Sequence, residues 1–196
     1  MSKNILLGSL LSLLFFSVLF TQISCSKSEK TEMTKEEMVK HGEYLVTLGG
    51  CNHCHSPKVF TDMGPVPDTT KLLSGHPAES KLPPIDPTLV QPGKWILTPG
   101  DLTAWVGPWG VSFAANLTPD EPTGLGTWTD EVFIKAIRSG KHMGIGRPIL
   151  PPMPWPDIAK STDEDLKAIF AYLKSLPPVR NKVPDPIPPN QLAEVK

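Results

Sequence analysis

The pentapeptide Cys51-Asn52-His53-Cys54-His55 constrains this 196-residue chain more than any other feature. Its CxxCH spacing is typical of covalent attachment of a c-type haem. Each of the two thiols can add to one vinyl group of the haem, and the histidine that follows is then held at the iron as an axial ligand. We therefore expect one covalent haem c, with Cys51 and Cys54 as its tethers and His55 as the proximal iron ligand.

Two other uses of a cysteine pair fit the sequence less well. A thioredoxin-like dithiol belongs in a βαβ unit, whereas here a helical pattern precedes the motif and a loop rich in Pro and Gly follows it. A structural zinc site needs two more thiolates or imidazoles at a matching spacing, and the chain has 3 cysteines without a second pair. The pattern therefore favours haem attachment.

The start of the chain has the features of an export signal. Lys3 supplies a short positive start and is followed by an apolar run from Ile5 to Phe20. This run is short for a membrane-spanning helix, which needs about twenty residues. We therefore predict that residues 1–24 are a signal peptide and that the protein works on the exported, periplasmic side of a bacterial membrane.

The third cysteine lies where a bacterial lipoprotein carries its lipid. Cys25 follows a small residue at the end of the leader, although Gln22 stands where that pattern usually has Leu. We predict a lipoprotein-type signal, lipid attachment at Cys25 and a flexible polar tether over residues 25–33. Simple removal of the leader and an uncleaved anchor are the alternatives.

The predicted mature part is nearly neutral. Removing Lys3 with the leader leaves 18 of the 19 basic residues against 20 acidic ones, a formal charge of −2. A nucleic-acid-binding domain would need a basic stripe, so we expect no nucleic-acid partner. The expected partners are transient redox proteins and, through the lipid, the membrane.

A first helix is predicted directly before the haem-attachment motif. Thr34 and Glu37 have the spacing of a capping box, which begins a helix, and Gly49-Gly50 ends it. This helix therefore leads straight into Cys51. Its predicted apolar face consists of Met38, Tyr44, Leu45 and Leu48.

Two more amphipathic helices are predicted in the second half of the chain. One begins near Thr129 and ends at Gly140. The other begins at Ser161, with Glu164 as its capping-box partner, and ends at Pro177-Pro178. No segment shows the strict alternation of a half-buried strand, so we predict an all-α fold around a cofactor.

Residues 56–127 form a long stretch rich in Pro and Gly that also contains Trp95, Trp105 and Trp109. Such a stretch is unusual in a compact domain unless it is functional or packs on something large. We interpret it as a loop insertion that wraps around the haem edge, with a mobile excursion as the alternative. Residues 184–196 are predicted to be a Pro-rich tail that lies extended on the surface.

The sixth ligand of the iron decides what a haem can do. A methionine sulfur opposite the histidine raises the potential and suits electron transfer, whereas an open position invites ligand chemistry. We predict Met153 as this ligand, because it lies in the proline-stiffened segment Leu150–Trp155 just before the last helix. The alternatives are Met143, Met63, His76, His142 and an open site.

Several motifs together resemble a class I cytochrome c. These are the helix that leads into CxxCH, Met153-Pro154-Trp155, and a last helix with Ala171-Tyr172-Leu173 before Pro177-Pro178. Three further stretches are similar to the haem domains of the cytochrome c subunits of alcohol and gluconate dehydrogenases. They are residues 115–120, 123–131 and 163–166. This resemblance implies one class I cytochrome c-like helical domain over residues 34–183.

The resemblance also implies roles for residues outside the motif. Gly42 and Tyr44 look like the surface that contacts Tyr172. Trp128 resembles a tryptophan whose indole N–H reaches a haem propionate, with Asn116 as a polar partner and core packing as the alternative for Trp128. We also expect the backbone carbonyl of Pro65, or else that of Pro57, to accept a hydrogen bond from the second N–H of His55. Arg147 is a further candidate for binding a propionate, because of its charge.

We therefore expect a monohaem cytochrome c that transfers single electrons between redox proteins and is not itself an enzyme. Two alternatives stay open. The chain could be the cytochrome subunit of a membrane dehydrogenase complex, or a haem enzyme or gas sensor with a labile sixth ligand.

Overall fold

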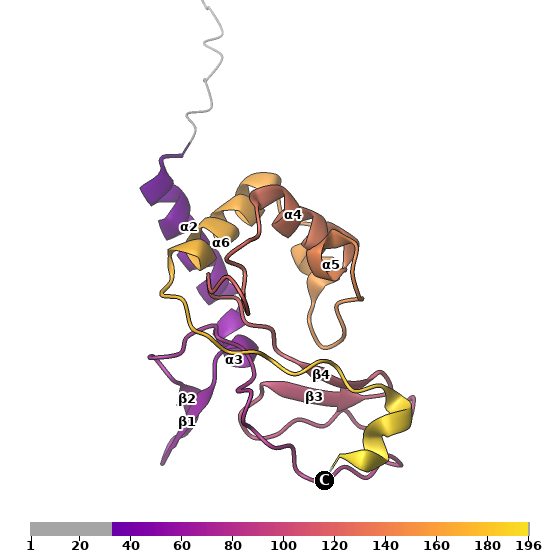
Figure 1. Cartoon of the computed structure of the whole chain (residues 1–196). Helices are drawn as coiled ribbons and strands as arrows, with labels where there is room; N and C mark the ends of the chain where they lie inside the picture. The colour runs from indigo at the N-terminus through magenta and orange to yellow at the C-terminus, as the bar shows by residue number, and fades with distance from the viewer. Residues whose placement is uncertain (1–32, 196) are drawn as a thin grey trace, which may run out of the picture. The chain divides into compact units, whose positions relative to one another are not determined.

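The computed structural model describes residues 33–195. The predicted signal peptide, Cys25 and most of the predicted tether lie outside these residues. The described part contains the following elements (Figure 1): the helices α2 (Lys35–Leu48), α3 (Cys51–His55), α4 (Asp130–Ser139), α5 (Trp155–Ile158) and α6 (Asp163–Ser175), the strands β1 (Lys58–Thr61), β2 (Gly64–Pro67), β3 (Ala104–Gly107) and β4 (Gly110–Phe113), and the 3-10 helices η2 (His142–Gly144) and η3 (Pro189–Glu194). Within residues 33–195, no helix combines the length and the hydropathy needed to cross a bilayer.

Helices α2 and α6 cross at close range (Figure 1), and a glycine makes this possible. A Cβ atom on Gly42 would collide with the carbonyl oxygen of Ala168 and lie 2.8 Å from Cβ of Tyr172. The expected contact between Gly42 and Tyr172 is therefore confirmed. Tyr44 does not share it, because its side chain is 60% exposed and stacks on His41 instead.

Helix α2 begins where the sequence predicted, but the face that it buries differs from the predicted one. Thr34 and Glu37 form the predicted capping box. The residues that α2 buries are Gly42 and Val46, whereas Leu48 is 70% exposed. The predicted apolar face was wrong in part, because Met38 and Leu45 are partly buried but Tyr44 and Leu48 are exposed. The close crossing centres on a glycine, which does not count as hydrophobic in a periodicity pattern.

One hydrophobic core holds the three long helices together. Phe133 of α4 stacks on Phe170 of α6 with 5.0 Å between the ring centroids. Helix α4 begins after Thr129 and ends at Gly140, as predicted. The buried members of this core are Val46, Leu73, Leu125, Phe133, Ile137, Leu166, Phe170 and Leu173.

Helix α6 begins one residue later than predicted. Its N-cap is Thr162, whose hydroxyl accepts a hydrogen bond of 3.1 Å from the backbone N–H of Asp165. The sequence Ser161-Thr162-Asp163-Glu164-Asp165 contains two overlapping patterns of a hydroxyl residue followed three positions later by an acid. The capping-box pattern fits Ser161 with Glu164 more closely, so it predicted a start one residue too early.

The prediction of an all-α fold is wrong, because the described part is a mixed fold of helices and two small antiparallel sheets. Val59 lies opposite Val66 in the hairpin β1–β2, and Val106 opposite Val111 in β3–β4. Strands β1 and β2 are mostly exposed on both faces, and β3 and β4 are mostly buried on both. Neither pair can show the alternation that identifies a half-buried strand.

A second, smaller core organises part of the predicted loop insertion. Its buried members are Val90, Val106, Val111 and Leu192. Leu192 comes from η3, and just before it Ile187 exchanges two backbone hydrogen bonds with Val111, of 2.8 and 3.0 Å. The tail is therefore extended only as far as Pro188 and then forms a 3-10 helix.

Candidate haem site

The attachment motif forms a short helix of its own. Helix α2 ends at Gly49, and Gly50 turns the chain with a left-handed φ of 64° into α3, which consists of the five motif residues. Residues three positions apart lie on one side of a helix, so α3 presents the thiols of Cys51 and Cys54 together. Both thiols are free and partly buried, and burial raises the pKa of each. Burial therefore favours the protonated form of both thiols.

His55 is held in the orientation and protonation state that an iron ligand needs. Its side chain is buried, and Nδ1 lies 2.8 Å from the carbonyl oxygen of Ala115. Burial lowers the pKa of this imidazole and so favours the neutral form. Because a carbonyl only accepts, Nδ1 carries the proton, and the lone pair is left on Nε2 for a metal.

The predicted acceptors for this proton were wrong. Pro65 lies exposed in β2, opposite Phe60. Pro57 is buried, but its carbonyl oxygen accepts from the backbone N–H of Asp68 at 2.8 Å. Ala115 lies 60 positions after His55 and acts through its main chain. A backbone acceptor leaves no side-chain signature, so the sequence offered no signal for it.

A loop between His55 and the Ala115 segment fixes the two relative to each other. The N–H of Gly75 donates to the carbonyl of His55 at 2.7 Å, and the N–H of His76 donates to the carbonyl of Ala114 at 2.9 Å. Gly75 has a φ of 82°, and a Cβ atom there would lie 2.6 Å from the Ala114 oxygen. Only glycine fits this position without strain.

Asn116 has a structural role instead of the expected place beside a propionate. Its Oδ1 accepts from the N–H and the hydroxyl of Thr118, at 3.0 and 2.7 Å. Its Nδ2 donates to the carbonyl of Val179 at 2.8 Å and to the hydroxyl of Thr123 at 3.1 Å. Because protein partners use both ends of the amide, Asn116 ties the His55 support to the chain beyond α6.

Asn181 completes this support and was missed in the sequence. Its Nδ2 donates to the carbonyls of Ser74 and His76, at 2.7 and 2.9 Å. Its Oδ1 accepts from the N–H of Ala78 at 3.0 Å. An asparagine in a Pro-rich segment ordinarily indicates a turn, so its type alone did not single it out.

Of the three methionine candidates for the sixth ligand, only Met153 is partly buried. Met143 is 46% exposed, and Met63, at the turn between β1 and β2, is 95% exposed. Two residues before Met153, the carbonyl of Pro151 accepts from the hydroxyl of Ser112 on β4 at 2.5 Å. Met153 stays our prediction.

The two histidine candidates differ in their contacts. The ring of His76 is buried, and its Nδ1 lies 2.7 Å from the hydroxyl of Thr103. Its buried Nε2 has no hydrogen-bond partner among the described residues, so His76 stays an alternative. His142 packs edge-on against Trp128, with 5.3 Å between the centroids.

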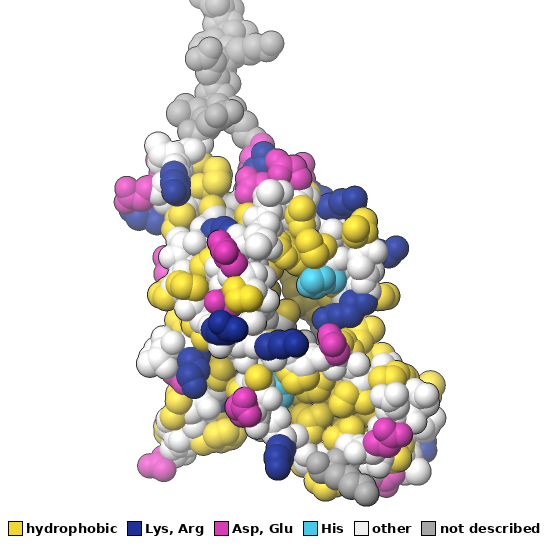
Figure 2. Space-filling view, viewed as in Figure 1, with side chains coloured by type: hydrophobic (Ala, Val, Ile, Leu, Met, Phe, Trp, Pro, Cys, Tyr) yellow, Lys and Arg dark blue, Asp and Glu magenta, His cyan; other side chains and the backbone are white. Residues whose placement is uncertain are grey.

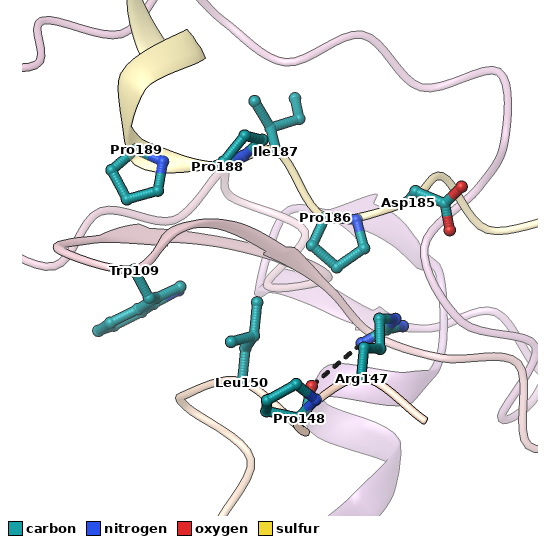
Figure 3. Close-up of a pocket in the computed structure, with 9 residues that line it drawn as sticks. All are labelled: Trp109, Arg147, Pro148, Leu150, Asp185, Pro186, Ile187, Pro188 and Pro189. Atoms are coloured by element: carbon teal, nitrogen blue, oxygen red, sulfur yellow. Dashed lines mark hydrogen bonds between the residues drawn. The ribbon is translucent and has the colours of Figure 1, made fainter. Parts of the chain in front are cut away.

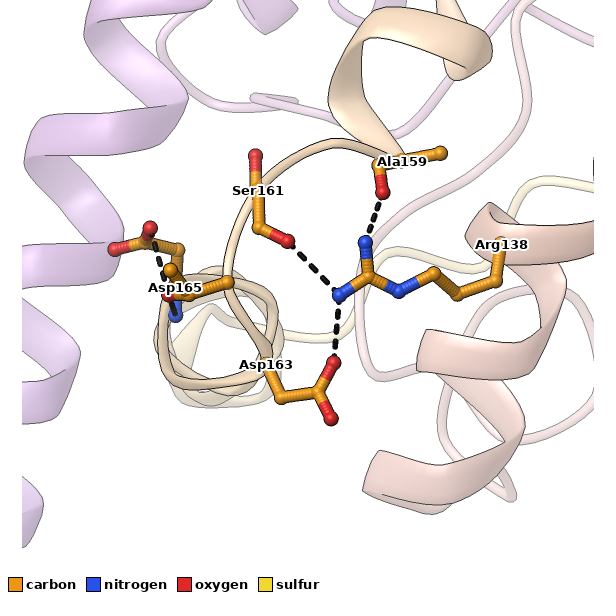
Figure 4. A network of polar contacts seen from close by, with 6 residues as sticks. Arg138, Ala159, Ser161, Asp163 and Asp165 are labelled. Atoms are coloured by element: carbon orange, nitrogen blue, oxygen red, sulfur yellow. Dashed lines mark hydrogen bonds and ion pairs between the residues drawn. The ribbon is translucent and has the colours of Figure 1, made fainter.

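A network from α4 anchors the chain after Met153 (Figure 4). The guanidinium of Arg138 donates to the carbonyl of Ala159, to the carbonyl of Ser161 at 2.8 Å and to Oδ1 of Asp163 at 2.6 Å. These contacts fix the connection between α5 and α6. The segment that carries Met153 is therefore held at both ends, by Ser112 before it and by Arg138 after it.

Trp128 and Arg147 lie in different surroundings. Trp128 is partly buried and packs against the main core. Arg147 is exposed and lines an apolar groove of about 350 Å³ (Figure 3), between the segment that leads to Met153 and the C-terminal tail. The other lining residues are Trp109, Pro148, Leu150, Asp185, Pro186, Ile187, Pro188 and Pro189. A propionate role stays a prediction for Trp128 and Arg147.

The residues present fit a covalently bound iron porphyrin. Two free thiols lie on one short helix, a neutral buried imidazole follows them with its Nε2 lone pair available, and a partly buried thioether lies on an anchored segment. This donor set is the one that c-type cytochromes use. On the face drawn in Figure 2, the surface is hollowed between the helices and the part with β3 and β4, and hydrophobic side chains line the hollow.

Comparison with known proteins agrees with this chemistry. The chain is 30% identical over 141 residues to the gluconate 2-dehydrogenase cytochrome c subunit of Pantoea cypripedii. The aligned region covers 72% of this chain and 24% of that subunit. It is 29% identical over 153 residues to the cytochrome c subunit of alcohol dehydrogenase (quinone) from Gluconobacter oxydans. Here the aligned region covers 76% of this chain and 24% of that subunit.

A shorter match extends over part of the chain. The fructose dehydrogenase cytochrome subunit of Gluconobacter japonicus is 38% identical over 66 residues, which is 34% of this chain and 13% of that subunit. No family model matches the chain. The chain thus spans about a quarter of the length of the gluconate and alcohol dehydrogenase subunits. This chain therefore carries a cytochrome c haem domain and is related, over most of its length, to the cytochrome c subunits of gluconate and alcohol dehydrogenases.

Proposed function

We propose that this chain is a monohaem cytochrome c that passes single electrons between redox proteins and makes no bonds in a substrate. The observation that carries the proposal is the state of His55: buried, with Nδ1–H donated to Ala115 and Nε2 available, directly after two free thiols. The bound haem supplies a one-electron ferric/ferrous couple. The protein supplies the tethers, the ligands and the apolar surroundings.

Each residue of the site has a separate part in this proposal. Cys51 and Cys54 would tether the haem, and His55 and Met153 would supply the ligands of its iron. Ligands that are anchored in both oxidation states keep the rearrangement during electron transfer small. The contacts of Ala115 with His55 and of Ser112 with Pro151 support such anchoring. Trp128 and Arg147 are the proposed propionate partners.

The test is the haem content of the full chain, exported in a host that matures c-type cytochromes. We expect one haem per chain that stays with the polypeptide under denaturing conditions, together with the absorption spectrum of a low-spin c-type haem. Cys51→Ala and Cys54→Ala should each weaken the attachment, and the double variant should abolish it. A colourless wild-type protein, or a haem that extraction removes completely, would refute the proposal.

We also propose that residues 34–183 are the haem-binding domain, followed by the tail 184–196, and that Cys25 carries a lipid on the exported side of the membrane. The leader pattern before Cys25 supports this localisation. Fractionation of cells that express the full chain tests it. Wild type should appear in the membrane fraction, and Cys25→Ala should appear in the soluble exported fraction. Equal distribution of the two proteins would contradict lipid attachment.

A second candidate function is that of a subunit in a dehydrogenase complex. The names of the relatives favour it, because each is the cytochrome subunit of a dehydrogenase. Native purification of the full chain from its own membranes separates the two possibilities. Constant co-purification with a substrate-oxidising dehydrogenase would support the complex. A haem protein that elutes as a free monomer would support an independent carrier.

A further inference from the structure

Lys58 places a positive charge at the end of the haem-attachment helix. It lies three residues after His55, at the start of β1, and is partly buried. Its Nζ donates to the carbonyl of Ser56 and, at 3.3 Å, to the carbonyl of Asn52. The last carbonyls of a helix lack partners within the helix, so this ammonium group stabilises the end of α3.

The same charge lies beside the attachment motif, because the Asn52 carbonyl that accepts from Nζ stands between Cys51 and Cys54 in the chain. Burial lowers the pKa of Lys58, and the carboxylate of Asp101 opposes this effect. The surroundings of the ammonium group therefore include the carboxylate of Asp101 and the haem-binding turn.

We propose that Lys58 is a tuning residue that raises the reduction potential of the haem. This inference depends on the proposed function. Reduction adds one electron from a redox partner and lowers the charge at the iron by one, without forming or breaking a covalent bond. A fixed positive charge that is hydrogen-bonded to the attachment turn favours the state of lower positive charge. Because Lys58 is partly buried, salt screens its effect less than that of a surface lysine.

The chain offers a matched control for this charge. Lys40 on α2 has a side chain that is 71% exposed and pairs with Glu36 at 3.0 Å. Lys58→Met and Lys40→Met remove the same charge, but only Lys58→Met removes it from the attachment turn. Lys58→Arg keeps the charge and so separates the electrostatic role from a loss of side-chain packing.

The experiment is a spectroelectrochemical titration of the haem-loaded wild type and variants at low and at high salt. We expect a lower midpoint potential for Lys58→Met at both salt concentrations, a value close to wild type for Lys58→Arg, and a smaller shift, lost at high salt, for Lys40→Met. An unchanged potential in Lys58→Met, or equal shifts in Lys58→Met and Lys58→Arg, would overturn the proposal. A wild type without covalent haem would instead refute the proposed function.

Asp101→Asn provides a second test if Lys58→Met does not mature. It removes the negative charge that faces Lys58 and keeps an oxygen that can accept from Thr103, as Asp101 does at 2.9 Å. The potential should rise, opposite in direction to the shift in Lys58→Met. An unchanged or lowered potential in Asp101→Asn would contradict the proposal.

Discussion

The two proposed iron ligands are held in different ways. His55 lies at the end of a helix, its carbonyl accepts from the backbone N–H of Gly75, and its imidazole donates to the backbone carbonyl of Ala115. Met153 lies on a segment without regular structure, and the side chains of Ser112 and Arg138 hold the main chain before and after it. The histidine side therefore depends on main-chain groups that the side chains of Asn116 and Asn181 support, and the methionine side depends on the side chains of Ser112 and Arg138.

This difference has a consequence for function. Local opening requires little free energy where few contacts hold a segment. Exchange of the sixth ligand should therefore be easier than any disturbance of His55. An open sixth position would turn the protein from an electron carrier towards a ligand-binding haem protein, so the contacts around Met153 decide between the two classes.

The largest expected effect is the complete loss of a ligand on the methionine side. Met153→Ala removes the proposed thioether, so the near-infrared band of sulfur-to-iron coordination should disappear and the reduced protein should bind carbon monoxide rapidly. Met143→Ala is the matched control and should keep the band, because Met143 is 46% exposed. A band that survives in Met153→Ala and disappears in Met143→Ala would exchange the roles of the two residues.

On the histidine side, the largest effect should come from a single methyl group. Gly75→Ala puts a Cβ atom 2.6 Å from the carbonyl oxygen of Ala114, at a φ of 82°. A strained φ and overpacking each cost about 1–3 kcal/mol, so the free energy of unfolding should fall by about 2–6 kcal/mol. Denaturant unfolding of the haem-loaded protein measures it.

Gly93 provides the control for Gly75. It has a similar φ of 80°, but a Cβ atom there would meet nothing within 4 Å. Gly93→Ala therefore tests the backbone strain without the collision and should cost only the strain contribution, about 1–3 kcal/mol. Equal losses in the two variants would show that the contact with Ala114 does not hold the loop.

The sequence predicts the parts of the site that are contiguous in the chain better than the parts that distant segments bring together. The attachment motif is contiguous, so Cys51, Cys54 and His55 are recognisable from their spacing. The partner of His55 is a backbone carbonyl 60 positions away, and its position depends on the fold of residues 73–76 and 114–116. Main-chain contacts between distant segments leave no side-chain pattern to read.

The fold was predicted where helices are long and was missed where strands are short. Helix α4 has 10 residues with matching signals at both ends, and its bounds were predicted closely. The strands have 4 residues each and are not exposed on one face and buried on the other. An alternation with a period of two is visible in a sequence only when a strand is long enough and has one buried and one exposed face.

A smaller effect is expected from the anchor after Met153. Arg138→Gln removes the donors to Ala159 and Ser161 and the ion pair with Asp163. The free energy of unfolding should fall by about 1–2 kcal/mol. Carbon monoxide should also bind the reduced variant faster than wild type, because the Met153 segment opens more often.

Lys160→Met is the control for this anchor. Its ion pair with Asp157 lies in the same connection but joins side chains that are 77% and 76% exposed. Exposed pairs contribute little, so the stability should change by less than about 0.5 kcal/mol. If Arg138→Gln binds carbon monoxide no faster than Lys160→Met, the network does not restrain the Met153 segment.

The smallest effect concerns a polar contact between α2 and α6, on the scaffold that leads into His55. The carboxylate of Asp165 accepts from Nε2 of His41 at 2.7 Å and from the hydroxyl of Thr162 at 2.8 Å. These bonds, the His41 contact above all, lower the pKa of Asp165 from its ordinary value of 3.8. A carboxyl group with a lowered pKa in the folded state stabilises the fold above its unfolded pKa.

This stabilisation should be lost as the pH falls through the folded pKa of Asp165, below 3.8. Asp165→Asn should therefore be less stable than wild type near pH 6, and the difference should shrink towards pH 3 as the wild-type carboxylate becomes protonated. Unfolding free energies of the two proteins across this range measure the effect. Parallel curves would mean that the carboxylate contributes no pH dependence, and that the crossing at Gly42 holds α2 against α6 through packing alone.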